Sequence, residues 1–461
     1  MSAEVREAFE KAVRVSGAVG AQLSIVRGGE TLDLVHGLAN AELSLPMTED
    51  TLVQCGSVTK VFNATMIMSL VEEGKLDLDV PVKEYFPEFM VADPKATSTI
   101  SLRHLLTMSA GIDNGDYRDF GEGEDAIARR VASLRTLPQH FSPGRYFGYS
   151  NAGTDISGHV AERVTGTAWD QLLRKRVLQP AGLKHAASLD RDRVFHRVSV
   201  GHALDKNGRA QVVRPWGLTR GLGPAGGTFT INARDLAKFA RVFINSGISE
   251  SDERVLSETS VRTMMTPQID VPVHYQAVSW CVGPCIQDWN GVKLWGHRGG
   301  NISGVSYLYW IPEKNAAMAW VMNTPSVLPR FEKVIVQEVM QAAFGFEKPE
   351  IKPPALPVKI DPRRYLGTYD ALGGRCLVDV VDAKLVMRRI WKDFVNEAVE
   401  LEETVSLVPL GGDRFLMDRG EAADPLALVE DTAFVGDDSY GSAANLISFV
   451  FPYSRANGRR S

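Results

Sequence analysis

Cysteine is scarce in this chain, which excludes a fold held together by a framework of disulfides. The 461 residues include four cysteines, spread from position 55 to position 376: Cys55, Cys281, Cys285 and Cys376. Disulfide-stabilised domains are small and carry cysteines densely. Cys281 and Cys285 do not have the spacing of a zinc knuckle, and the nine histidines form no H-x-x-x-H pattern. We therefore expect reduced thiols and no metal site.

Long apolar runs are also missing. A membrane-spanning helix needs about 18 or more consecutive apolar residues, and no such run occurs. The N-terminal segment "MSAEVREAFEKAVRVSG" has the pattern of a charged amphipathic helix. It lacks the basic start, apolar run and small-residue cleavage site of a signal peptide. We expect a cytoplasmic protein with no membrane partner.

The chain has no large excess of charge of either sign. It carries 51 Lys and Arg against 56 Asp and Glu, a formal net charge of -5, and no block of like charges stands out. Nucleic-acid-binding domains are usually basic, with Lys and Arg clustered on one face. The composition therefore gives no reason to expect a nucleic-acid partner.

A chain of 461 residues with 44% hydrophobic residues is long enough for more than one buried core. A proline-rich stretch, "KPEIKPPALP", divides it and has the composition of a semi-rigid linker. We predict a first domain at residues 1–347, a linker at 348–357 and a second domain at 358–461.

The first domain is predicted to be an α+β fold with strands near both of its ends. Residues 21–40 and 276–322 show strand patterns with turn signals at Arg27–Glu30, Asn290–Gly291 and Pro312–Asn315. Helical patterns fill most of the sequence between them, including 101–111, 168–182 and 231–247, and a last one covers 328–345. Asn232 is the predicted N-cap of the pattern at 231–247. We expect one antiparallel sheet built from both ends, with the terminal helices on one face and the helical middle on the other.

The second domain has a different pattern. Short alternating stretches such as "YLGTYDAL" and "RCLVDVVDAKLVMRRI" are separated by Gly and Asp. This pattern is typical of a small antiparallel barrel or half-barrel.

The segment "CGSVTKVFNATMIMSLVEEGK" (55–75) places Ser57 three residues before Lys60 at the start of a helix. Residues three apart share a helix face, so the Lys60 amine can reach the Ser57 hydroxyl. The unpaired N–H groups of a helix start favour a developing negative charge. The following residues are mostly apolar, so Lys60 is expected to be partly desolvated, as a lysine base requires. A bare S-x-x-K is more often a capping serine and a surface lysine, so context has to decide.

Two further segments supply that context. "FSPGRYFGYSNAG" (141–153) carries Tyr149 and Asn151 just before a predicted helix, and "LWGHRGGNISG" (294–304) is glycine-rich within a strand region. Glycines inside strands often mark close approach of a ligand to the backbone. No G-x-S-x-G motif of an α/β-hydrolase occurs.

The order S-x-x-K, then Y-x-N, then a basic residue and a glycine on a late strand resembles the penicillin-recognising serine hydrolases. The best match is the branch of class C beta-lactamases, DD-peptidases and esterases. The phrases "LRHLLTMSAGI", "PAGGTFTINARDLAKF" and "GHRGGNISGVSYLYWIPE" are similar to this family too, so the resemblance covers roughly residues 5–345. It implies the beta-lactamase/transpeptidase-like fold, with an antiparallel sheet flanked by helices and an all-helical lobe.

The resemblance also implies roles for individual residues. Ser57 would be the acylated nucleophile, while Lys60 and Tyr149 would share the base and acid work as a coupled pair. The backbone N–H groups of Ser57 and Gly300 would form the oxyanion hole. No organic cofactor is implied, because this serine chemistry is self-sufficient.

His297 is implied to be a fourth catalytic residue beside Ser57, Lys60 and Tyr149, and substrate contacts are implied for Asn151, Arg298 and Gly299. His297 stands where the family often has Lys. Arg298 replaces a Thr or Ser that contacts the substrate carboxylate, and these departures put beta-lactam hydrolysis in doubt. Arg298 could bind a carboxylate, or strand alternation could turn it away. We adopt the first alternative as a hypothesis: His297 and Arg298 together bind a negative or strongly polar substrate group.

The family likeness favours a peptidase or amidase acting on peptides with D-residues. A carboxylesterase for small esters, a thioesterase that cyclises peptides and a catalytically silent binding protein are the alternatives. The second domain resembles the lipocalin-like barrels appended to some family members. It is either a wall that selects acyl groups or a module for stability or dimerisation. The expected partner is a small-molecule or peptide substrate, and a homo-oligomer is left open.

Overall fold

The computed structural model describes residues 2–392, 399–420, 424, 428–439 and 441–456. Its first part is built on a nine-stranded antiparallel sheet with strand order β3-β2-β1-β14-β13-β12-β11-β10-β9. Strands from the two ends of this part pair in the middle of the sheet, where β1 lies beside β14, as the sequence predicts. The strands are β1 Gly20–Arg27, β2 Glu30–Asn40, β3 Leu45–Pro46, β9 Ile269–Asp270, β10 Ser279–Trp280, β11 Cys285–Trp289, β12 Val292–Gly300, β13 Val305–Ile311 and β14 Ala316–Met322.

The hairpins of this sheet form at the predicted turns. Asn290 and Gly291 both have positive φ, +56° and +91°, which a two-residue turn between β11 and β12 requires. Asn315, with φ of +45°, ends the turn between β13 and β14. Arg27 pairs with Glu30 across the hairpin of β1 and β2.

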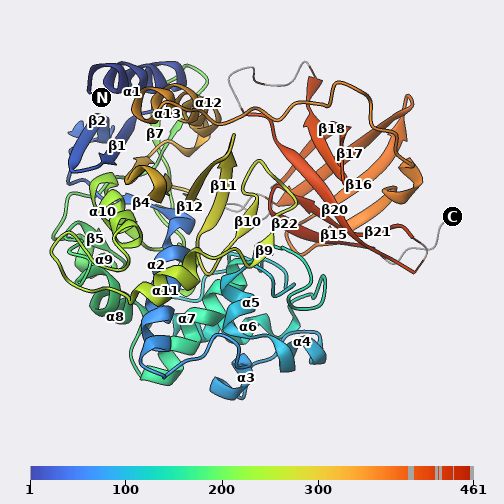
Figure 1. The fold of residues 1–461 in the computed structure, drawn as a ribbon, viewed down its shortest axis with the longest axis horizontal. Coiled ribbons are helices and arrows are strands. Elements are labelled where there is room, and N and C mark those ends of the chain that lie inside the picture. Colours follow the sequence, from blue (N-terminus) through green and yellow to red (C-terminus); the bar gives the residue numbers. More distant parts are fainter. Residues whose placement is uncertain (1, 393–398, 421–423, 425–427, 440, 457–461) are drawn as a thin grey trace.

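Helices cover both faces of the sheet. The terminal helices α1 (Ser2–Ser16), α12 (Leu328–Val334) and α13 (Met340–Phe344) lie on one face (Figure 1), with a π-helical turn between α12 and α13. Their core includes Trp320 of β14 against Phe331 of α12, with ring centroids 5.1 Å apart. On the other face α2 (Thr59–Glu72) and α10 (Ala233–Ile244) form a second core, in which Phe62 stacks on Phe239 at 3.8 Å.

The middle of the chain forms the predicted helical lobe. Two of its helices are shorter than their patterns indicate: the helix expected at 101–111 ends at Leu106, and the one at 168–182 gives way to a π-helical turn after Leu173. Asn232 caps α10 as predicted, accepting from the Asp235 N–H at 2.8 Å. The other helices are α3 Val82–Tyr85, α4 Pro94–Thr99, α5 Leu102–Leu106, α6 Ala126–Ser133, α7 Asn151–Thr165, α8 Trp169–Leu173, α9 Asp190–Arg193 and α11 Glu258–Met265. The short strands are β4 Val53–Gln54, β5 Ala186–Ala187, β6 His202–Leu204, β7 Ala210–Val212 and β8 Thr230–Ile231.

The C-terminal part is a closed antiparallel barrel (Figure 1), which decides between the predicted barrel and half-barrel. Closure comes from β22 pairing with β15, where Arg455 lies opposite Tyr369. Apolar and aromatic side chains fill the interior, with Tyr365 and Phe434 at 4.9 Å between ring centroids. The strands are β15 Gly367–Ala371, β16 Gly374–Val381, β17 Lys384–Lys392, β18 Glu400–Gly411, β19 Arg414–Asp418, β20 Asp431–Asp437, β21 Ala443–Ser448 and β22 Phe451–Arg455.

Two aspartates hydrogen-bond the barrel to the sheet domain, one contributed by each part. Asp113 of the sheet domain accepts from the Leu372 N–H of the barrel at 2.9 Å. Asp431 of the barrel accepts from the backbone N–H groups of His274 and Tyr275, each at 2.9 Å. These carboxylates satisfy backbone donors that the interface would otherwise bury unpaired, so the contact is specific.

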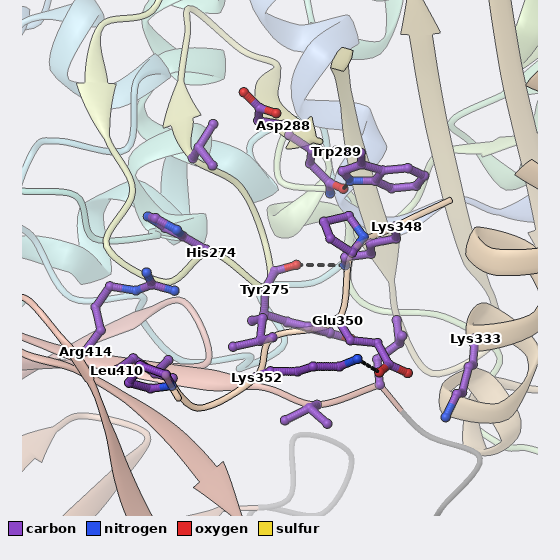
Figure 2. Close-up of a pocket in the computed structure, with 17 residues that line it drawn as sticks. His274, Tyr275, Asp288, Trp289, Lys333, Lys348, Glu350, Lys352, Leu410 and Arg414 are labelled. Atoms are coloured by element: carbon purple, nitrogen blue, oxygen red, sulfur yellow. Dashed lines mark hydrogen bonds and ion pairs between the residues drawn. The ribbon is translucent and has the colours of Figure 1, made fainter. Parts of the chain in front are cut away.

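The linker packs into the junction and borders a cavity of about 400 Å³ (Figure 2). Lys348 is buried there and donates from Nζ to the Tyr275 carbonyl oxygen at 2.9 Å. Lys352 pairs with Glu350 at 3.3 Å. Neither Ser57 nor any other residue of the predicted site lines this cavity.

The described helices include none with both the length and the apolar character that a bilayer crossing demands. All four cysteines are buried, and none forms a disulfide.

Candidate active site

Ser57 lies in a tight turn at the start of α2, against the end of β12. Gly56–Val58 form one 3-10 turn that leads into α2. Gly56 has φ of +55°, the left-handed region that glycine enters at least cost. A Cβ at Gly56 would lie 2.4 Å from the Gly300 nitrogen, and one at Gly299 would lie 2.8 Å from the Ser57 nitrogen. The glycines therefore let β12 touch the turn, and the amide nitrogens of Ser57 and Gly300 meet at one junction.

Lys60 reaches Ser57 from one turn further along α2. It is buried, with 1% of its surface exposed. Its Nζ lies 3.0 Å from Ser57 Oγ, 2.7 Å from Asn151 Oδ1 and 2.6 Å from the carbonyl oxygen of Ala225. The structure thus brings Ser57, Lys60 and Asn151 together from positions far apart in the sequence.

The three contacts of the Lys60 amine fit its neutral form. The two shortest are to carbonyl oxygens, which only accept hydrogen bonds, so they take two N–H donors. A neutral amine then has one lone pair left, and the remaining neighbour is a hydroxyl that can donate to it. This arrangement lets Lys60 accept the proton of Ser57.

Electrostatics agree with this geometry. Burial lowers the pKa of Lys60 to about 7, while Asp155 and Cys55 act in the opposite direction. A large fraction of Lys60 is therefore neutral near pH 7, as a general base working at that pH needs.

Tyr149 stands on the other side of the amine. Its ring centroid is 4.9 Å from Lys60 Nζ, and its phenol hydrogen-bonds Ser57. Burial raises the pKa of Tyr149 well above its usual value. Tyr149 therefore keeps its proton near neutral pH, and Lys60 is the better base of the two.

His297 faces the same site and is uncharged. Its Nδ1 donates to the carbonyl oxygen of Arg298, because a carbonyl only accepts, so Nε2 carries no proton in the neutral ring. Nε2 is buried and has no hydrogen-bond partner among the described residues. Burial, followed by the nearby Lys60, lowers the pKa of His297 to about 3. His297 thus offers the site an uncharged acceptor.

Arg298, which the sequence interpretation left either in the site or turned away from it, has its contacts away from Ser57. Strand alternation turns its side chain to the opposite face of β12, toward α12. There its Nη2 lies 3.3 Å from Glu332, a carboxylate that is 1% exposed. The guanidinium also lies over the rings of Tyr275 and Tyr307, at 5.1 and 5.0 Å. Arg298 is therefore part of the scaffold behind the site.

We expect Arg298→Thr to destabilise the protein by roughly 3–5 kcal/mol, because it leaves Glu332 buried without its cation. Turnover of carboxylate-bearing and neutral substrates should then fall in the same proportion. Urea unfolding and paired kcat/KM measurements check this. As a control, the double change Arg298→Met with Glu332→Met removes both charges and should recover much of the stability. A variant of full stability that loses only carboxylate-bearing substrates would restore the recognition hypothesis.

Asn151 is held by both ends of its side chain. Oδ1 accepts from Lys60, and Nδ2 donates to the hydroxyl of Tyr117 at 3.3 Å. The helix α7 is capped by Ser150, which accepts from the Gly153 N–H at 3.1 Å. Asn151 is therefore free of the capping role that its position alone would suggest.

The sequence interpretation missed several residues around Lys60. Tyr117, Ala225, Asp155 and Arg130 lie in or behind the site. Asp155 could have been found, because it follows Asn151 by four residues and so shares its helix face. Ala225 lies in the segment "PAGGTFTINARDLAKF" that resembles the family, but only the fold shows that its carbonyl oxygen accepts a hydrogen bond from Lys60.

The barrel reaches the site through the turn between β21 and β22. The Tyr149 N–H donates to the Val450 carbonyl oxygen at 3.1 Å. Phe451 lies edge-on to the Tyr149 ring at 5.9 Å, and Trp280 lies edge-on to it at 5.7 Å. Residues of the barrel thus form part of the surroundings of Tyr149.

Known proteins are similar to this chain in sequence and in fold. The profile of the Beta-lactamase family matches residues 5–338. Penicillin-binding protein 4 of Amycolatopsis lactamdurans is 32% identical over 360 residues, 77% of this chain and 94% of that protein. Esterase EstB of Burkholderia gladioli is 35% identical over 205 residues, 40% of this chain and 50% of EstB.

Among solved structures, that of SurE has 27% sequence identity and a TM-score of 0.79, and it covers 98% of both chains. SurE has also been solved with D-Leu, and that structure shows 24% identity and a TM-score of 0.76 over 99% of this chain. The likeness therefore includes the barrel as well as the sheet domain. The match of the family profile over most of the chain shows that this protein belongs to the beta-lactamase family, within the penicillin-recognising serine hydrolases.

Proposed function

We propose that this protein transfers acyl groups from amide or ester bonds through a covalent intermediate on Ser57. The observation that carries the proposal is the set of contacts at Lys60, whose amine has two carbonyl acceptors and the Ser57 hydroxyl as neighbours. This is a positioned base beside a nucleophile, at a glycine-lined turn where the amide nitrogens of Ser57 and Gly300 meet.

The steps follow from this geometry. Ser57 Oγ attacks the carbonyl carbon and its proton moves to Lys60, so the carbonyl oxygen becomes an oxyanion. The N–H groups of Ser57 and Gly300 bind that oxyanion, and losing one such donor typically costs about 2.7–4 kcal/mol. The oxyanion then collapses and the bond to the leaving group breaks, while Tyr149 gives a proton to the departing nitrogen or oxygen and regains one from Lys60. Water or an amine then attacks the acyl-Ser57 ester and loses a proton to Lys60, and the acyl–oxygen bond breaks as Ser57 Oγ takes that proton back.

Substrate selection follows from what faces Ser57. Asn151 presents an amide group and His297 an unprotonated Nε2, both of which suit a neutral amide. Apart from Lys60, no described contact of Ser57, Tyr149 or His297 is with a cationic side chain. We therefore propose a substrate that is uncharged beside the scissile bond.

We propose a peptidase or amidase that acts on amides of D-residues. Two findings on relatives support this: one relative is a penicillin-binding protein, and SurE was solved with D-Leu. In this proposal the barrel is a wall that limits the acyl group, because Phe451 contacts Tyr149 and the barrel interior is already filled.

The test is a panel of matched substrates: D- and L-phenylalanine p-nitroanilide, p-nitrophenyl butyrate, and a peptidyl thioester ending in a D-residue. We expect kcat/KM for the D-anilide to exceed that of its L-isomer by about ten-fold or more, a ratio within reach of pocket shape. Phe451→Ala should lower this ratio and leave hydrolysis of the small ester nearly unchanged. Equal rates for the two anilides would contradict the preference for D-residues.

Two alternatives have their own outcomes in the same panel. Turnover of the butyrate ester with no anilide cleaved would favour a carboxylesterase, the class of EstB. Conversion of the thioester to a cyclic peptide would favour a peptide-cyclising thioesterase. No turnover of any activated substrate would favour a catalytically silent binding protein.

A further inference from the structure

Asp155 is a buried carboxylate behind the site whose position calls for an explanation. It lies in α7, one turn after Asn151, and none of its surface is exposed. Burying a carboxylate is costly unless it is paired and hydrogen-bonded. Its Oδ2 accepts from Arg130 Nε at 3.3 Å, and its Oδ1 accepts from the Ala225 N–H at 3.2 Å.

Ala225 connects Asp155 to the active site. Its N–H is held by Asp155, and its carbonyl oxygen accepts the shortest hydrogen bond of Lys60, at 2.6 Å. The next residue, Gly226, packs on the nucleophile turn: a Cβ there would lie 2.2 Å from the Gly56 carbonyl oxygen. Any shift of Ala225 would therefore move both the acceptor of Lys60 and the support of the turn that carries Ser57.

Of the ionisable groups that the structure describes around Lys60, Asp155 is the one whose charge acts on the Lys60 pKa near neutral pH. Burial raises the pKa of Cys55 to about 12 and raises that of Tyr149 well above its usual value, so both are neutral near pH 7. His297 is neutral because burial lowers its pKa. Among the described ionisable groups that face Lys60, Asp155 is thus the one that carries negative charge near neutral pH. Behind Asp155 the guanidinium of Arg130 also pairs with Asp116, at 2.8 Å.

We propose that Asp155 is a positioning residue for Lys60: it holds the Ala225 acceptor in place, and its negative charge sets the pH at which Lys60 becomes a free base. This inference rests on the proposed function. Burial raises the pKa of Asp155 to about 6 and lowers that of Lys60 to about 7, so the two groups titrate close together. A plain scaffold role would give Asp155 the Arg130 contact alone, with no effect on the titration of Lys60.

The test measures the rate constant of Ser57 acylation by a fluorophosphonate from pH 5 to 10. In the wild type the rate should rise with pH through about 7, because the protonated Lys60 has no lone pair for the Ser57 proton. Asp155→Asn removes the charge that favours the protonated form. The rise should therefore move to lower pH by about one unit, within the range that one nearby charge produces.

Asp116→Asn is the matched control, because it makes the same chemical change at the other carboxylate that pairs with Arg130 and has no recorded contact with Ala225. It should leave the midpoint in place. If Asp155→Asn does not fold, Asp155→Glu keeps the charge but displaces Ala225, and it should lower the acylation rate with the midpoint unchanged.

The outcomes separate the two proposals. A wild type that never acylates at Ser57 overturns the proposed function. Two other results would overturn only the role of Asp155, provided that the wild type acylates normally. In the first, the acylation rate of Asp155→Asn rises at the same pH as that of the wild type. In the second, Asp116→Asn shifts the midpoint of the rise as much as Asp155→Asn does. A full wild-type rate for Asp155→Glu contradicts the positioning through Ala225.

Discussion

Ser57→Ala is expected to abolish acylation and to reduce substrate turnover by roughly 10⁶-fold, the order of loss seen when a serine hydrolase loses its nucleophile. The alanine lacks the oxygen that would form the covalent bond, and water has no equivalent place beside Lys60. The measurement is labelling by a fluorophosphonate, with the modified peptide mapped by mass spectrometry.

Ser98→Ala serves as the control, because Ser98 is an exposed serine on α4 and should label like wild type. The fold of both variants is checked by thermal unfolding. Full labelling of Ser57→Ala would contradict the assignment, and the position of the label would then identify the true nucleophile.

Lys60→Met is expected to lower the rate of acylation by about 10²–10⁴-fold, the usual contribution of a general base. Methionine keeps much of the volume and the apolar stem of lysine, so the change removes mainly the amine. Restored activity at high pH is not expected, because burial keeps Tyr149, the other group beside Ser57, protonated well above neutral pH. A Lys60→Met variant with wild-type rates at pH 7 would exclude Lys60 as the base.

The same variant should change how stability depends on pH. Lys60 has a lowered pKa in the folded protein, so the unfolded chain binds more protons and wild-type stability rises with pH between about 7 and the usual lysine value. For a fully buried amine with its pKa near 7, the gain between pH 7 and 9 is roughly 2 kcal/mol.

Urea unfolding of wild type and Lys60→Met at pH 7 and 9 isolates the contribution of Lys60 to the change in unfolding free energy, because the other titrating groups are common to both proteins. The wild type should gain roughly 2 kcal/mol more than the variant over this interval. Lys83→Met, at an exposed lysine of α3, is the control and should follow the wild type. Parallel curves for Lys60→Met and wild type would mean that Lys60 stays charged in the fold.

Much of the fold follows from local features that the sequence displays. Asn290 and Gly291 predict a hairpin because few other residue pairs accept two positive φ angles. Asn232 predicts a helix start because its side chain can satisfy an unpaired N–H. Such signals act within a few residues, so they survive without knowledge of the tertiary contacts. The helix end at Leu106 differs from the predicted one because Met108 has a φ of +56°, a conformation that its residue type does not signal.

His297 and Arg298 show most clearly the difference between what the sequence predicts and what the tertiary structure decides. Alternation along a strand says that the two side chains point to opposite faces, but it does not say which face holds Ser57. That depends on β12 lying between β11 and β13, with α12 bringing Glu332 to the face of Arg298. The charge of His297 likewise depends on burial, which is a property of the assembled site.

By itself, the sequence determined the pairing of Ser57 with Lys60, because three residues on a helix place two side chains on one face whatever surrounds them. It also determined an antiparallel sheet domain followed by a barrel, because alternation and turn residues act locally. The tertiary structure alone decided that Lys60 is buried beside Ser57, that Arg298 turns away, and that Asp155 reaches Lys60 through Ala225. These features arise from burial and from contacts between residues distant in the chain, and no local pattern encodes either.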